Sequence, residues 1–436
     1  MRALLTGASA AGLVAALTLG SAVAFGRPSG PTAAAGPAGP PAAGIAGLQQ
    51  RLREQPHDAA GWASLGAAYV ERARLTADPT YYPKAGEVLR RSLREAPGND
   101  GALAGLGALA AARHDFHGAL RYADGALKAN PYGQRAAAVR VDALVELGRY
   151  DDALAAARRA DATRPGIPIF TRLAYVRELR GDVPEARRVL GLARASATGP
   201  GDLAYIAVQL GELAWNDGDL GRAGREYAEA LRLSPGDLPA LDGDARVRAA
   251  RGDTAGALAV RAEIVRRLPL PQYLTEYGEL LESAGRRDEA ERQYAVATAW
   301  ARIAEANGVD ADLETALFES DHGDPDAALR AARAEYGRRC PGARVRRCSV
   351  HAADALAWAL HVNGRDAEAL RYARQATATG YRRAQFRFHL GAIEKALGKR
   401  AGARRDLAGS LHRNPHFSPL WAPRAKAALD DLEGAS

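Results

Sequence analysis

Apolar residues along most of this chain recur at intervals of three and four, which is the spacing of one face of an α-helix. In one stretch the series is Tyr150, Ala153, Leu154, Ala157 and Ala160, with mainly polar residues between them. No segment of the sequence has the sustained alternation of apolar and polar residues that is typical of a half-buried strand. The pattern predicts an all-α fold.

An internal repeat divides the helical pattern into units. A glycine is followed five residues later by an alanine, from Gly148/Ala153 to Gly398/Ala403, and successive alanines lie 33 to 41 residues apart. Each glycine can end a helix in the left-handed conformation that other residues resist, and each alanine lets two antiparallel helices approach closely. The glycines are Gly148, Gly181, Gly218, Gly252, Gly285, Gly323, Gly364 and Gly398, and His114 stands at the equivalent position upstream.

The repeat resembles the tetratricopeptide repeat family, whose units are pairs of helices about 34 residues long. The first unit carries the family signature in Trp62, Leu65, Gly66 and Tyr69. Ten units follow one another from about Ala59 onward. The resemblance implies a right-handed superhelical solenoid of about ten antiparallel helix pairs, whose first helices line a concave surface that binds an extended peptide or a partner helix.

The N-terminal segment predicts export. Arg2 precedes an uncharged apolar run that closes on Ala22-Val23-Ala24, a small-x-small pattern suited to signal peptidase. We interpret residues 1–25 as a cleaved signal peptide or an uncleaved signal anchor; the alternative is a disordered alanine-rich tail. Under either main interpretation the rest of the chain lies outside the cytoplasm, secreted or membrane-anchored.

The remaining boundaries follow from composition and from the repeat. Residues 26–45 are rich in proline, glycine and alanine and predict a flexible linker. Residues 46–417 are assigned to the repeat array, and residues 418–436 to a capping helix and tail. Three departures interrupt the regular spacing: extra residues around Tyr81 and Tyr82, a long second helix in the seventh unit, and the cysteine segment after the eighth. They are either functional loops or sequence drift.

Cys340 and Cys348 are the two cysteines of the chain. In an exported protein a disulfide between them is the preferred interpretation, and two unpaired thiols are the alternative. A tetrahedral metal site is disfavoured because the two thiolates supply only two of its four ligands.

Family resemblance also assigns the residues that face the groove. The candidate partner-binding residues are Tyr175, Glu178, Tyr205, Val208, Glu212, Trp215, Asp242, Arg246, Glu279, Glu282, Asp321, His351, Asp354, Trp358, His361 and Phe388. Carboxylates outnumber bases in this set, although the whole chain has a net charge of +8. We therefore expect an acidic, aromatic-studded groove suited to a basic or amphipathic segment. The alternative is that the carboxylates only keep an open surface soluble.

Motifs for catalysis are missing from the sequence. It contains no phosphate-binding loop, no G-x-S-x-G and no H-E-x-x-H. Asp321, His322, Asp324 and Asp326 could hold a hard cation, but a helix stop and restart with Asp324 as an N-cap is the favoured interpretation. No catalytic residue, cofactor or metal is predicted.

The overall prediction is a non-catalytic repeat scaffold that binds protein or peptide. The best basic patch consists of Arg338, Arg339, Arg344, Arg346 and Arg347. It lacks the interleaved aromatics that stack on bases, so no nucleic-acid partner is expected. The alternatives are an accessory to an envelope enzyme or a metal-handling system, with a site in the repeat turns, and a self-assembling structural array.

Overall fold

The computed structural model describes residues 42–340 and 348–434. Within these residues the chain forms twenty-two α-helices and no strand, which confirms the all-α prediction. The proposed signal segment of residues 1–25 and most of the proposed linker lie outside the described residues. In the part that is described, no helix combines the length and the apolar character needed to cross a bilayer.

Ten helical hairpins follow a single N-terminal helix, α1 (Ala42–Glu54), and precede a single C-terminal helix, α22 (Trp421–Gly434). Because α1 begins at Ala42, the helical region starts before the expected boundary at residue 46. The hairpins pair α2 (Ala59–Thr76) with α3 (Tyr81–Glu95), α4 (Asp100–Ala112) with α5 (Phe116–Ala129), α6 (Gln134–Glu146) with α7 (Tyr150–Thr163), α8 (Ile167–Leu179) with α9 (Val183–Ser196), α10 (Pro200–Asn216) with α11 (Leu220–Leu233), α12 (Leu238–Ala250) with α13 (Thr254–Arg267), α14 (Pro271–Ser283) with α15 (Arg287–Ala306), α16 (Asp312–His322) with α17 (Pro325–Arg339), α18 (Val350–Val362) with α19 (Asp366–Ala376), and α20 (Ala384–Ala396) with α21 (Arg400–Arg413).

The repeated small residues build each hairpin as expected. The eight repeated alanines, from Ala153 to Ala403, are all buried at the helix–helix contact, and so are Ala85 and Ala119 at the equivalent positions of the first two units. Seven of the eight repeated glycines adopt a positive φ between the two helices. Gly323 is the exception, with φ −136°, so the predicted left-handed cap is wrong at that position. His114 takes the left-handed conformation, with φ 63°, where the other units use glycine.

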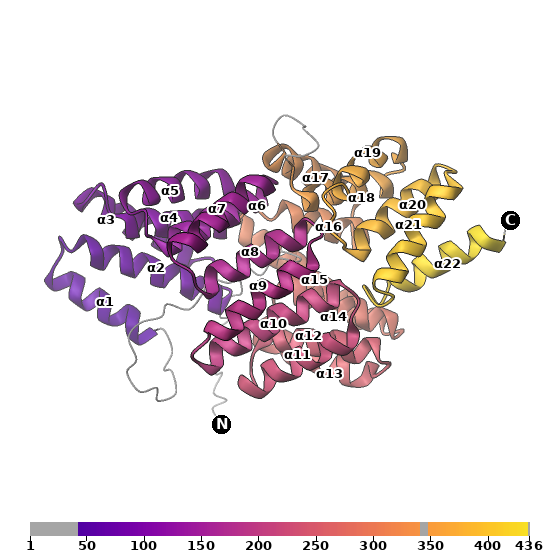
Figure 1. Ribbon diagram of the computed structural model, residues 1–436, viewed down its shortest axis with the longest axis horizontal. Coiled ribbons are helices and arrows are strands. Elements are labelled where there is room, and N and C mark those ends of the chain that lie inside the picture. The colour runs from indigo at the N-terminus through magenta and orange to yellow at the C-terminus, as the bar shows by residue number, and fades with distance from the viewer. Residues whose placement is uncertain (1–41, 341–347, 435–436) are drawn as a thin grey trace, which may run out of the picture.

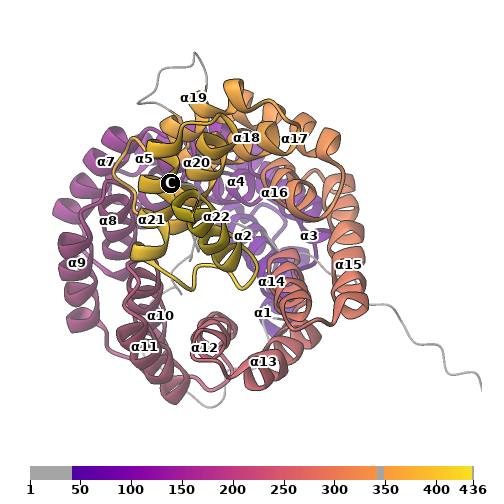
Figure 2. The ribbon, with the colours of Figure 1, turned by 90° about the vertical axis from the view of Figure 1, so that its right-hand side faces the viewer.

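The hairpins stack into a superhelix whose axis runs along the length of the molecule, from α1 at one end to α22 at the other (Figure 1). Figure 2 looks along this axis and shows the helices arranged in a ring. The chain turns counterclockwise as it approaches the viewer, and the superhelix is therefore right-handed. The fold implied by the family resemblance is confirmed.

The second turn of the superhelix packs directly on the first. We call this contact surface, where residues 113–217 meet residues 310–414, the seam. Its partners lie about six hairpins apart: the Val350 N–H donates to the Tyr150 hydroxyl at 2.9 Å, and the Asn414 side-chain amide donates to the Trp215 carbonyl at 2.9 Å. One apolar cluster, which includes Leu144, joins the two turns.

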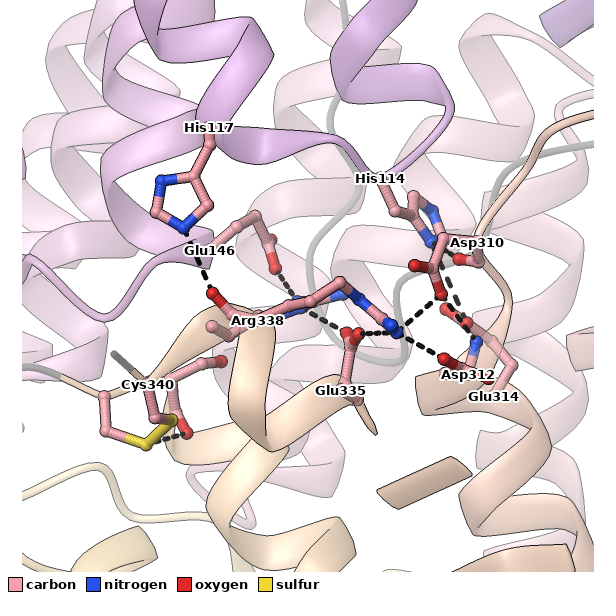
Figure 3. Close-up of polar contacts among 12 residues, drawn as sticks. His114, His117, Glu146, Asp310, Asp312, Glu314, Glu335, Arg338 and Cys340 are labelled. Atoms are coloured by element: carbon pink, nitrogen blue, oxygen red, sulfur yellow. Dashed lines mark hydrogen bonds and ion pairs between the residues drawn. A yellow bond between two sulfur atoms is a disulfide. The ribbon is translucent and has the colours of Figure 1, made fainter. Parts of the chain in front are cut away.

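A buried ion-pair group strengthens the seam (Figure 3). Arg339 of α17 pairs with Glu335 on its own helix and with Glu146 of α6 in the first turn. Its guanidinium also lies 4.5 Å from the ring centre of Phe116. Arg339 is 1% exposed, so its charge depends on these partners rather than on water. Beside it, Cys340 and Cys348 form a disulfide.

The three departures from regular spacing all contribute to contacts between distant units. The extra residues of the first unit end α2 at Ala77, which is fully buried in one cluster with Ile264 and Tyr273 of the sixth and seventh units. The long helix α15 carries Trp300 into the cluster formed by the first three units. The cysteine segment places Cys348 against Gly148. Residues at each of these departures therefore take part in packing between distant units.

A comparison of two glycines separates the contribution of the seam to stability from that of local helix capping. Gly218 and Gly252 both have a positive φ, but a Cβ at Gly218 would clash with the Arg413 carbonyl oxygen, whereas one at Gly252 would meet nothing within 4 Å. Gly252→Ala should lose roughly 1–2 kcal/mol from conformational strain alone. Gly218→Ala should lose clearly more in urea unfolding and should increase the radius of gyration in small-angle scattering. Equal losses would show that the turns do not touch.

The buried charge at the seam gives a second test. Arg339→Ala leaves Glu146 and Glu335 without their guanidinium and should lower the free energy of unfolding by roughly 3–5 kcal/mol. Arg330→Ala is the matched control on the same helix, because the Arg330 side chain is 72% exposed and its nearest carboxylate, Asp324, is 3.8 Å away. That control should change the unfolding midpoint little. A mild effect of Arg339→Ala would contradict a closed seam.

Candidate binding cavity

The hollow centre of the superhelix contains a cavity of about 2000 Å³. The first helices of the hairpins form most of its wall, from α2 to α16, because the hairpins turn their first helices toward the axis (Figure 2). Residues of the segment before α22, including Phe417 and Ser418, line it near the C-terminal end. The seam closes one side, so the expected groove is the interior of a tube instead of an open concave surface.

The cavity wall is acidic although the chain as a whole is basic. Sixteen aspartate and glutamate residues line it against eight arginines and no lysine. Several of these carboxylates have no Lys or Arg partner within ion-pair distance among the described residues, including Asp202, Glu305 and Glu319. The surplus arginines of the chain therefore lie elsewhere, on the second helices and at the seam.

A chain of alternating charges crosses one part of the wall. Arg246 of α12 donates to Glu212 of α10 at 3.2 Å and lies 3.2 Å from Asp242. Arg261 of α13 pairs with both Asp242 and Glu276 of α14. Burial raises the pKa of Asp242 to about 6, and the charge of Arg261 counteracts this. These contacts fix the first helices of three successive units relative to one another.

For other carboxyl groups of the wall, nearby cations and hydrogen-bond donors offset less of the cost of burial. Burial raises the pKa of Glu178 to about 7, even though the Asn216 amide donates to it at 2.9 Å. Burial also raises the pKa of Glu314 to about 8. Neither oxygen of Glu314 has a hydrogen-bond partner. The His114 Nδ1 lies 4.0 Å from Glu314, and burial lowers the pKa of that imidazole to about 4.

Ten of the sixteen residues proposed for the groove line the cavity. They are Tyr175, Glu178, Tyr205, Val208, Glu212, Trp215, Asp242, Arg246, Glu279 and Asp321. Among them Glu212, Asp242 and Arg246 are in direct contact. Trp215 is 7% exposed and packs beside Arg246, so it supports the wall more than it presents a ring to the cavity. Their role in binding a partner stays a prediction.

The other six proposed residues lie outside the cavity lining. They are Glu282, His351, Asp354, Trp358, His361 and Phe388. Five of them belong to the ninth and tenth units, whose first helices, α18 and α20, pack against the seam and against α22. Trp358 stacks on His389 at 4.1 Å, Phe388 contacts Trp421, and His351 lies 3.2 Å from the Tyr175 hydroxyl of the first turn.

Several charged residues of the wall were not found by sequence reasoning. Asp142 and Arg172 form a buried pair at 2.7 Å between α6 and α8, and Arg261 and Glu276 extend the charge chain. For Asp142, Arg172 and Glu276 the signal is a charge that recurs on the first helices of different units, which family positions alone do not reveal, whereas Arg261 lies on a second helix. Arg383 also lines the cavity, but it comes from the second turn, and no local pattern predicts a contact across the seam.

Asp324 of the turn cluster and two arginines of the basic patch have structural roles. The Asp324 carboxylate accepts from the Asp326 N–H at the start of α17, which is the expected capping role. Arg338 pairs with Asp310 at 2.7 Å and with Glu335 at 2.9 Å (Figure 3), and Arg339 is buried at the seam. The other three arginines of the basic patch lie outside the described residues.

Comparison with known proteins places these features in context. No protein-family model matches the chain. Cellulose synthase 1 operon protein C of Komagataeibacter xylinus is 31% identical over 159 residues, which are 34% of this chain and 11% of that protein. The match therefore spans only a small part of the relative's length.

Solved structures with similar helix arrangements include tetratricopeptide repeat proteins. One, a thermophilic protein from Thermus thermophilus, is 26% identical and covers 39% of this chain and 91% of its own, with a TM-score of 0.36. The human IFIT1 dimer with m7Gppp-AAAA is 12% identical and covers 85% of this chain and 86% of its own, with a TM-score of 0.47. The ten stacked hairpins of this chain form the tetratricopeptide-like helical solenoid that the sequence predicts.

The buried carboxyl group of Glu314 predicts a pH dependence. The folded protein keeps this group protonated up to about pH 8, whereas the unfolded chain releases the proton near the usual pKa of 4.5. The contribution of Glu314 to stability is therefore lost progressively as the pH rises from 4.5 to 8.

Glu314→Gln removes this titration while keeping the shape of the side chain. Relative to the unaltered protein, the variant should gain stability between pH 5 and pH 8, by an amount on the order of a few kcal/mol. Urea unfolding at several pH values measures the difference, in which the titration of His114 largely cancels. A difference that is constant across this range would contradict the burial of a protonated Glu314.

Proposed function

We propose that this tetratricopeptide repeat protein is a non-catalytic scaffold outside the cytoplasm whose central cavity binds a basic segment of a partner protein. The observation that supports this most directly is the excess of carboxylates on the cavity wall in a chain with a net charge of +8. Such an arrangement attracts lysine and arginine side chains and repels phosphates. It favours a protein partner over a nucleic acid.

The wall is also suited to binding because it is ordered before the partner arrives. The charge chain from Glu212 to Glu276 and the Asp142–Arg172 pair hold the first helices in place. A preordered surface loses little conformational entropy on association. The carboxylates without an arginine partner are then the groups that remain available to a basic segment, while the paired ones support the wall.

The extracytoplasmic location rests on two features. The apolar segment of residues 1–25 has the pattern of a signal peptide or signal anchor. The disulfide between Cys340 and Cys348 is the kind of bond that persists in oxidising compartments. N-terminal sequencing of the protein recovered from the cell envelope and from the culture medium would test both location and cleavage. A chain that starts at Met1 in the cytosolic fraction contradicts the proposal.

Charge reversal inside the cavity tests the binding proposal. Asp202, Glu305 and Glu319 line the cavity, and none of them has an ion-pair partner that the fold needs. The triple variant Asp202→Lys, Glu305→Lys, Glu319→Lys should bind a fluorescent lysine-rich peptide at least tenfold more weakly in anisotropy titrations. The affinity of the unaltered protein should fall as salt is added.

The control is a variant whose charge reversal lies on the outer surface of the superhelix. Glu87→Lys on α3 lies at an exposed position outside the cavity lining, and it should leave the affinity unchanged. Affinity capture from the cell envelope with the same three proteins extends the test to natural partners. If the triple variant and the control bind the peptide equally well, the acidic cavity is not the binding site.

A further inference from the structure

One group of cavity residues differs from the others in its neighbours. Glu279 of α14 and Asp321 and His322 of α16 come together at the wall, and one ligand atom from each lies within 4.8 Å of the other two. The His322 Nε2 is 3.4 Å from the Glu279 carboxylate. Two carboxylates and an imidazole are the donor types that bind zinc and similar divalent ions.

No arginine or lysine among the described residues neutralises the carboxylates of this group. Elsewhere on the wall, buried carboxylates such as Asp142 and Asp242 are paired with arginine. Among the described residues, no lysine or arginine lies within ion-pair distance of Glu279, Glu282 or Asp321. Glu282 accepts only the Tyr294 hydroxyl, at 3.2 Å. The basic side chain within ion-pair distance of Glu279 among the described residues is the His322 imidazole, which is itself a common metal ligand.

Neighbouring side chains hold the three donors in position. The Trp358 indole N–H donates to one Asp321 oxygen at 2.7 Å, which leaves the other oxygen for a ligand. The His322 ring stacks on the Tyr294 ring with 4.2 Å between centres. The His322 and Glu279 side chains are 5% and 14% exposed. Such support from surrounding groups is what orients ligands in metal sites.

We propose that Glu279, Asp321 and His322 bind one divalent transition-metal ion, of which Zn²⁺ is the best probe. The donor atoms of a tetrahedral zinc site lie about 3.3 Å apart, given bond lengths near 2.0 Å, so small side-chain rotations bring the three atoms into place. Glu279 and Asp321 face the cavity, and the fourth position is therefore open to water or to a donor from a bound partner. This site is independent of the basic-segment proposal.

Zinc titration of the tag-free, chelator-stripped full chain tests the site. Isothermal calorimetry should give one Zn²⁺ per chain, and the melting temperature should rise with zinc concentration because only the folded state holds the three donors together. Glu279→Gln and His322→Ala should each weaken binding at least 100-fold. Trp358→Phe, which removes the support of Asp321, should weaken it by roughly 10- to 100-fold.

The matched control is a histidine–glutamate pair at the surface. His57 lies 2.8 Å from Glu95 with its side chain 84% exposed, and His57→Ala should bind zinc as the unaltered protein does. Circular dichroism of each variant separates lost binding from lost folding, and the near-isosteric Glu279→Gln gives the decisive value if His322→Ala unfolds. The proposal is overturned if the unaltered protein takes up no zinc, if folded Glu279→Gln binds it normally, or if only a lysine-rich peptide occupies the site.

Discussion

The packing of the second superhelical turn on the first is the interaction on which the rest of the structure depends. A solenoid needs contacts only between neighbouring repeats, and such a chain could remain an open spiral. Here Arg339, Tyr150 and Asn414 make polar contacts between units about six hairpins apart. An apolar cluster spans the same surface. The seam converts an array of local contacts into a closed tube.

Because the second turn packs on the first, the concave surface of the superhelix becomes the wall of a cavity. The first helices of most units face a common cavity instead of an open groove, and their charged residues meet one another across successive hairpins. Three of the eight arginines of the wall, Arg172, Arg246 and Arg261, pair with Asp142, Glu212 and Asp242. The carboxylates that remain set the electrostatic character of the cavity. The acidic interior and the basic exterior are thus two consequences of the same arrangement.

The two proposals use different parts of this surplus charge. Carboxylates exposed to the cavity suit the mobile ammonium and guanidinium groups of a partner. Glu279, Asp321 and His322 are more buried, lie on two rigid helices and include an imidazole, which suits a compact ion with directional bonds. A metal at that position would stand next to any segment held in the cavity, so the two ligands could contact each other.

The sequence by itself determined the repeating unit. The positions of glycine and alanine predict ten hairpins, the family resemblance implies their right-handed stacking, and the structure has both. Ten of the proposed groove residues line the cavity for the same reason, since hairpin geometry dictates which face of a first helix turns toward the axis. These features depend on residues less than about 40 positions apart, and their pattern is therefore visible locally.

Only the tertiary structure decided whether the spiral is open or closed. The burial of Trp358 and Phe388 beneath α22, the use of Ala77 and Trp300 as contacts between distant units, and the meeting of Arg383 with the first turn all depend on the superhelical pitch. That pitch is the sum of small rotations between successive hairpins. A slight change in each rotation accumulates over six units, so no local pattern of residues fixes which distant side chains meet.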